Sequence, residues 1–158
     1  MKVNGIQVGG AKTALVVLPR AEGDIPFRFK AVLDTREFDD VHPRPKPPRK
    51  WVVGQGNIDD FNDKAFIERF NNWRELRGAW LFLKSLEDSE IEWDSVKKED
   101  PSTWKLWRKE LEDASFNAGE IAALESGFLE CNTVTDSMLK EARERFLLAV
   151  AVEQLPET

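Results

Sequence analysis

Cysteine and histidine are almost absent from this sequence, and tyrosine is missing altogether. Cys131 is the only cysteine, so the chain cannot form an internal disulfide, and no Cys-x-x-Cys pair is present to hold zinc. A nucleophile that needs a histidine base would have to use the single histidine, His42. These shortages argue against a disulfide-stabilised secreted domain and fit a chain made for a reducing cytosol.

Long apolar runs are lacking as well. The longest run near the N-terminus, residues 14–18, has the length of a β-strand and is far too short to span a bilayer. Residues 1–5 also lack the apolar stretch and the cleavage site of a signal peptide. We therefore expect a protein that is neither secreted nor embedded in a membrane.

Basic residues are fewer than acidic ones. Of the 158 residues 33% are charged, with 29 Asp and Glu against 23 Lys and Arg, which gives a net charge of −6. A duplex nucleic-acid binder usually gains affinity from clustered Lys and Arg, so a nucleic-acid partner is not expected. The 10 Phe and 6 Trp need burial, and they indicate a folded domain with a charged surface rather than a disordered chain.

Three regions of different composition follow one another along the chain. We predict an α+β fold, mainly α, with a small N-terminal β-hairpin element at residues 1–40. A proline-rich basic arm or linker follows at residues 41–60, and a C-terminal bundle of about four helices occupies residues 61–158.

The N-terminal region has the pattern of a hairpin. Residues 13–18 are rich in β-branched side chains, and residues 25–33 begin with alternating apolar and polar side chains. Residues 20–24 between them supply turn chemistry. Strands this short are marginal alone, so the hairpin should lean on a helix or on a partner chain.

Apolar residues recur at spacings of three and four through most of the C-terminal region, which is typical of amphipathic helices. The first predicted helix covers residues 63–86 with Asn62 as its N-cap. The second begins at Asp100-Pro101, and the third at Asn117, where Glu120 approximates a capping box. The fourth covers residues 135–152, and its expected core stripe consists of Met138, Leu139, Ala142, Phe146 and Ala149 or Val150.

Two segments imitate ligand-binding motifs. Residues 5–13 are rich in glycine, but Ala11 separates Gly10 from Lys12, and a strand rather than a helix is predicted next, so a P-loop is rejected for a glycine turn. Residues 57–63 crowd Asn and Asp, yet Phe61 stands where a calcium loop needs an oxygen ligand. Acidic side chains at the entry to a helix explain this cluster better.

The remaining reactive side chains also have plain structural interpretations. His42 lies in the proline-rich region, where a solvated loop is the expected setting, and Cys131 reads as a small buried apolar residue. We therefore predict no catalytic residues, no cofactor and no metal site, and we do not expect an enzyme.

Basic and aromatic residues are the best candidates for contacts with a protein partner. The arm combines four prolines at positions 43–48 with basic side chains and then Trp51, which suits an extended segment that docks on an acidic partner. A charged linker remains the alternative. Trp73 and Trp80 lie two turns apart on the first predicted helix, and they either pack in the core or bind in a groove of a partner. The candidate residues are Arg44, Lys46, Arg49, Lys50, Trp51, Trp73 and Trp80.

Seven short segments follow one another along the chain: FKAVL at 29–33, EFD at 37–39, PRPKPP at 43–48, AWLFLKSL at 79–86, IEWDSV at 91–96, DPSTW at 100–104 and EARERFL at 141–147. In the order of these segments, the region from Phe27 to Leu148 resembles the tail assembly chaperones of long-tailed bacteriophages. The resemblance covers roughly three quarters of the chain and is structural, with no ligand set or catalytic triad.

This resemblance implies a non-enzymatic protein of the infected bacterial cytoplasm. It would hold apolar helical stretches of the phage tape measure protein soluble and deliver them to tail tube subunits. Self-association of the chain is compatible with that role. A structural component of the virion tail or head-tail region is the main alternative, and a phage-encoded hydrolase or nucleotide-binding enzyme is a weaker one.

Overall fold

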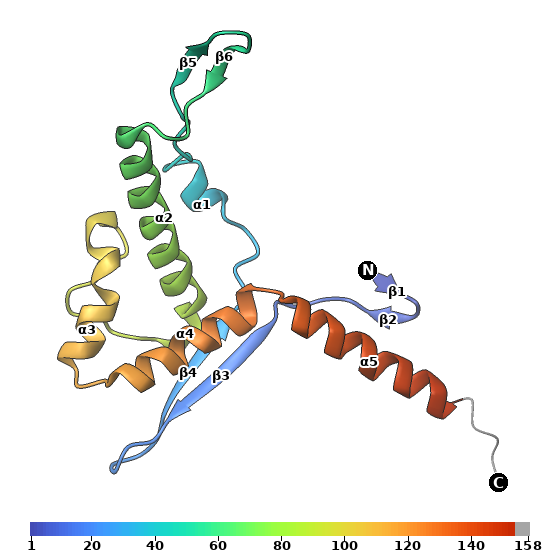
Figure 1. Cartoon of the computed structure of the whole chain (residues 1–158). Coiled ribbons are helices and arrows are strands. Elements are labelled where there is room, and N and C mark those ends of the chain that lie inside the picture. The colour runs from blue at the N-terminus through green and yellow to red at the C-terminus, as the bar shows by residue number, and fades with distance from the viewer. Residues whose placement is uncertain (154–158) are drawn as a thin grey trace.

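The computed structural model describes residues 1–153 (Figure 1). This part of the chain contains three antiparallel two-stranded sheets and a series of helical segments. Two of the sheets precede the helices, and the third interrupts them between a short helix and the longest one. The predicted α+β, mainly α fold class is confirmed.

The central hairpin pairs β3 (Thr13–Leu18) with β4 (Ile25–Lys30), and the paired residues run from Thr13 with Lys30 to Leu18 with Ile25. Successive side chains of a strand point to opposite faces. One face therefore buries Leu18, Phe27 and Phe29, whereas the other face is exposed.

Helix α4 (Ala118–Asn132) covers the buried face of this hairpin. Ile121 and Leu124 pack there beside Phe29, and all three side chains are at most 1% exposed. The hairpin thus leans on a helix of its own chain, as its length predicted. The N-terminal element and the helices share this core, so they do not form separate hydrophobic units.

A second core forms around Phe38 of α1 (Arg36–Asp39). Trp80 of α2 (Lys64–Ser85) and Trp104 of the 3₁₀ segment η2 (Pro101–Leu106) close around its ring. Helix α3 (Trp107–Asp113) continues directly from η2, and Figure 1 shows it beside α2. The sequence pattern did not indicate α1, because one helical turn is too short to show a helical period.

The end of α4 is tied to both neighbouring layers. The Asn132 side chain accepts a hydrogen bond from the Val32 amide at 2.9 Å and donates one to the Ser85 hydroxyl at 3.1 Å. Ser85 in turn donates to the Lys30 carbonyl at 2.7 Å. These bonds fix α4 against β4 and the end of α2, where the 3₁₀ segment η1 (Glu87–Ser89) follows.

The predicted helix starts are largely confirmed. Asn117 and Glu120 form a reciprocal capping box, and Asp100 caps a segment with proline in its first turn. That segment begins as a 3₁₀ helix rather than as an α-helix. The N-cap of α2 is Asp63 instead of Asn62, because the Asp63 carboxylate accepts a hydrogen bond from the Phe66 amide.

The arm contains a hairpin where an extended segment or a linker was predicted. Residues 43–48 have no regular structure, and β5 (Arg49–Val52) pairs with β6 (Gly56–Asp59). This hairpin stands beyond the N-terminal end of α2 in Figure 1. Another small hairpin, β1 (Lys2–Val3) with β2 (Ile6–Gln7), has no buried residue.

Helix α5 (Asp136–Glu153) differs most from expectation. Its limits agree with the predicted fourth helix, but the helix runs away from the body of the protein (Figure 1) and has no buried residue. The stripe of Met138, Leu139, Ala142, Phe146, Ala149 and Val150 therefore does not enter the core of its own chain.

Candidate protein-binding surfaces

Two of the four basic side chains proposed for partner contacts, Arg49 and Lys50, already have partners within the arm. The Lys50 ammonium lies 2.9 Å from the Asp60 carboxylate, and it holds the pKa of that carboxyl below its usual range. Arg49 donates to the Asn57 carbonyl at 3.0 Å. Trp51, between them, is 72% exposed. On β5, the indole is therefore the group that offers free surface to a partner.

The start of the arm, with Arg44, lies against α2. The Arg44 guanidinium stands 5.1 Å from the centre of the Phe70 ring, which itself stacks on Trp73. The Trp73 indole donates to the His42 carbonyl at 2.7 Å and thereby ties the start of the arm to the helix. Lys46 is exposed on the irregular segment. The structure thus brings Arg44 close to Trp73 but leaves Trp51 on a separate hairpin.

Trp80 belongs to the core rather than to an open surface. Its side chain is 6% exposed, and its ring centre lies 5.5 Å from that of Phe38. Of the two candidate tryptophans on α2, the core interpretation therefore fits Trp80, whereas Trp73 is half-buried at the surface.

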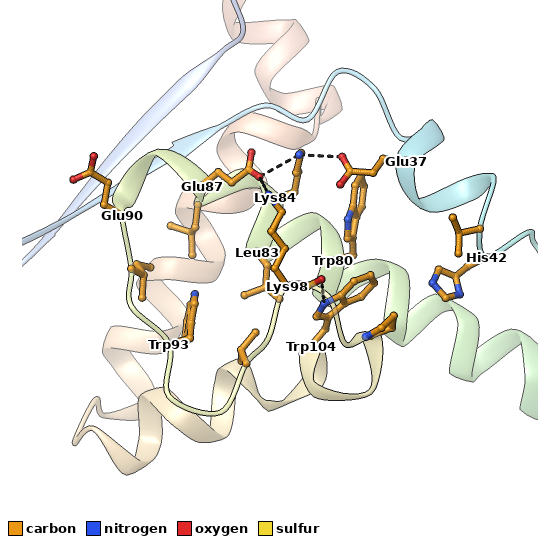
Figure 2. Close-up of a pocket in the computed structure, with 15 residues that line it drawn as sticks. Glu37, His42, Trp80, Leu83, Lys84, Glu87, Glu90, Trp93, Lys98 and Trp104 are labelled. Atoms are coloured by element: carbon orange, nitrogen blue, oxygen red, sulfur yellow. Dashed lines mark hydrogen bonds and ion pairs between the residues drawn. The ribbon is translucent and has the colours of Figure 1, made fainter.

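One edge of Trp80 lines an open cavity of about 440 Å³, which we call the aromatic pocket (Figure 2). Its walls combine indole rings with aliphatic side chains, and its rim is charged. Cavities of this size and character are typical of binding sites for small molecules or for anchoring side chains. The aromatic and aliphatic lining residues are Val41, Trp80, Leu83, Leu86, Ile91, Trp93, Val96, Pro101 and Trp104.

Ion pairs link four of the charged side chains that line the aromatic pocket. The Lys84 ammonium lies 3.0 Å from Glu37 and 3.2 Å from Glu87, and Lys98 also lies 3.2 Å from Glu87 (Figure 2). Partial burial alone would lower the pKa of Lys84, but its hydrogen bonds to both carboxylates outweigh that effect and raise it. At Lys84, Lys98, Glu37 and Glu87 the rim therefore presents paired charges.

A second hollow lies between α2, α3 and α4 and measures about 490 Å³; we call it the α2–α4 groove. Its floor is apolar, with Phe82 stacked on Trp107 at 4.0 Å between ring centres. Gly78 and Ala79 form one wall, and Leu129, which is 49% exposed, stands on the other. The sequence contained one indication of this groove, namely Gly78 in the middle of a predicted helix. A glycine at such a position normally lowers stability and therefore calls for an explanation.

Helix α5 is the largest uncovered apolar element among the described residues. Phe146 is 66% exposed and Leu148 is 68% exposed. In its last two turns, residues 146–152 are all apolar, so every side of the helix carries apolar side chains there. A helix that is apolar all round is normally buried. This surface therefore requires a cover from outside its own chain or a rearrangement of the helix.

The residues with reactive side chains stand apart from one another. His42 packs its ring 4.9 Å from that of Phe38, and Cys131 is 6% exposed in the first core, where burial raises the pKa of its thiol. Within residues 1–153, no group of three or more His, Cys, Asp or Glu side chains is placed to hold a metal ion. No helix of the same residues is long and apolar enough to cross a membrane.

Comparison with known proteins adds no relative. No family model matches the chain, and neither a curated protein nor a solved structure matches it.

Proposed function

We propose that this protein is a non-enzymatic tail assembly chaperone of a long-tailed phage. It binds apolar helical segments of the tape measure protein, and also tail tube subunits, in the host bacterial cytoplasm. The observation that carries the proposal is α5, an 18-residue helix without a single buried residue. The tape measure protein is proposed as the client because the order of sequence segments resembles that of phage tail assembly chaperones.

The energetics suit capture of a helix. Each large apolar side chain that leaves water contributes about 1.5–3 kcal/mol, and Leu139, Phe146 and Leu148 are all more than half exposed. Part of this gain is offset by the entropy lost on association. An amphipathic client helix can pair its own stripe with α5, and the indole of Trp51 provides a separate contact. Contacts of this kind can be released when the tube polymerises.

A structural role in the virion is the second candidate. It is favoured by the hairpins β1–β2 and β5–β6, which each contain only two strands and therefore leave strand edges unpaired by further strands. Such edges can accept a strand from a neighbouring subunit. In that case the protein would remain in the particle, with α5 and the hairpins buried between subunits.

Co-expression with helical fragments of the tape measure protein tests the preferred function. The wild-type chain should keep the fragments soluble and co-purify with them, and Phe146→Asp should lose both effects. Leu33→Asp is the matched control, since Leu33 is a 79% exposed apolar residue outside α5. Equal rescue by the wild type and by Phe146→Asp would refute the role of α5.

The two candidates differ in the mature particle. A chaperone should be missing from purified virions, whereas a structural component should be present in a fixed ratio to the other tail proteins. Quantitative mass spectrometry of virions therefore decides between them, and stoichiometric recovery would overturn the chaperone proposal.

A further inference from the structure

Gly78 has no role within its own chain. It lies in the middle of α2, where glycine is less favourable than alanine by about 0.5–1 kcal/mol. A Cβ atom added to it would meet nothing within 4 Å, and its backbone has no positive φ that would require glycine. Small residues on a helix surface allow another helix to approach closely. Gly78 and Ala79 therefore give the α2–α4 groove a wall suited to a helix.

Helix α5 offers matching small residues. Its stripe alternates large and small side chains, with Leu139, Ala142, Phe146 and Ala149 spaced by three and four. Ala142 and Ala149 can approach the wall at Gly78, while Phe146 can enter the apolar floor of the groove. The large side chains of one surface then meet the small side chains of the other.

The charges beside the two surfaces are also complementary. At about 3.6 residues per turn, Arg143 and Arg145 fall on opposite sides of the α5 stripe. Glu75 on α2 and Glu125 on α4 stand on opposite walls of the groove. Each carboxylate already accepts from one base, Lys105 at 3.1 Å for Glu75 and Arg108 at 2.8 Å for Glu125. A carboxylate has sites for about four hydrogen bonds, so each can also accept from an arginine of α5.

The link between α4 and α5 directs α5 away from the groove of its own chain. Asn132 is held by its bonds to Val32 and Ser85, and Thr133 after it is extended, with φ −130 and ψ 156. Only residues 133–135 separate the two helices. To turn α5 back onto its own groove, the chain would have to rebuild this anchored junction.

We infer that α5 of one copy docks in the α2–α4 groove of a second copy, and that the exchange is reciprocal. The complementary surfaces then close a symmetric dimer, in which each Phe146 is covered by the other chain. The inference rests on the proposed function only in that it concerns the same helix. In the dimer, the second copy covers α5 while no client is bound, and a client must displace that copy in order to bind α5.

Light scattering coupled to size-exclusion chromatography tests the inference without any client. The full chain should elute with twice its monomer mass of 18.1 kDa. Gly78→Leu fills the groove, and it should yield a folded monomer because space at Gly78 is open. Phe146→Asp should also yield a monomer, with a rise in the dissociation constant of at least about 30-fold, as for other anchoring residues. Arg69→Leu also places a leucine on the exposed surface of α2, but outside the groove, and it should leave the dimer intact.

Mixing the two monomeric variants gives the sharpest result. Gly78→Leu retains a free α5 and Phe146→Asp retains a free groove, so the mixture should form a heterodimer although neither variant dimerises alone. A dimeric Gly78→Leu, or a monomeric Arg69→Leu, would overturn the groove as the docking site. A wild-type chain that stays monomeric would overturn the second copy as the occupant.

The same variants separate this inference from the proposed function. Gly78→Leu leaves α5 free, so it should still capture tape measure fragments. A wild-type chain that captures the fragments but stays monomeric would refute the inference alone, whereas a normal dimer that fails to capture them would refute the chaperone proposal alone.

Discussion

Two glycines in helices should respond in opposite ways to the same substitution. Gly127 of α4 lies against the central hairpin, and a Cβ atom there would stand 2.5 Å from Cγ2 of Val16 and 3.0 Å from two ring carbons of Phe29. Gly78 of α2 faces open space. Alanine at each position removes the same helix penalty, so the difference in stability between the variants isolates the packing of α4 on the hairpin.

The magnitudes follow from this geometry. Alanine in place of a mid-helix glycine adds about 0.5–1 kcal/mol, and this is the whole effect expected at Gly78 in a monomer. At Gly127 overpacking costs about 1–3 kcal/mol. The upper part of that range applies because Val16 is β-branched and Phe29 is 1% exposed, so neither side chain can move aside. Gly127→Ala should therefore lose about 2 kcal/mol net.

Urea unfolding, followed by tryptophan fluorescence, measures both changes. Each substitution is made in the Phe146→Asp background, where the chain is expected to be monomeric and stability does not depend on protein concentration. Melting temperatures should move in the same directions, by about 2–4 °C per kcal/mol for a chain of this size. If Gly127→Ala proved as stable as Gly78→Ala, the close contact between α4 and the hairpin would be refuted.

Three further changes probe the second core, the α1 ion pair and the α4 junction. Phe38→Ala should cost about 3–5 kcal/mol in urea unfolding, because the ring is 1% exposed at the centre of the aromatic cluster; a loss under about 1 kcal/mol would contradict that placement. Hydrogen bonds from Arg77 and Thr35 lower the pKa of Asp39 in the folded state. These hydrogen bonds stabilise the folded state at pH values above the pKa that Asp39 has in the unfolded chain, and this stabilisation is lost as the pH falls below about 4. The melting temperature of Asp39→Asn should therefore fall less steeply on acidification than that of the wild type. Asn132→Ala should cost about 1–3 kcal/mol by leaving the Val32 amide without its acceptor, and unchanged thermal stability would show that this anchor is dispensable.

Local signals in the sequence were sufficient where the physics is local. The capping box of Asn117 and Glu120 and the Asp100-Pro101 start are formed by neighbours in the chain, so their spacing alone predicts them. The hairpin β3–β4 follows from its alternation and from its turn residues in the same way.

Long-range packing explains what the sequence did not reveal. The short helix α1 exists because Phe38 is enclosed by residues some 40–65 positions later, such as Trp80 and Trp104, which leaves no local period to detect. The stripe of α5 was correctly placed on a helix, but periodicity cannot tell whether a stripe faces its own core or another chain. The same limit applies to the arm, where the pairing of Lys50 with Asp60 depends on a hairpin that the sequence analysis did not predict.

The central claim is that another protein chain covers α5. A photo-crosslinking amino acid, benzoylphenylalanine, placed at Phe146 tests this directly in cells that produce the tail proteins. The account predicts adducts with the tape measure protein during assembly and with a second copy of the chain before it, and none from the same group at Leu33. Failure to form either adduct from position 146, with the protein folded and abundant, would contradict it.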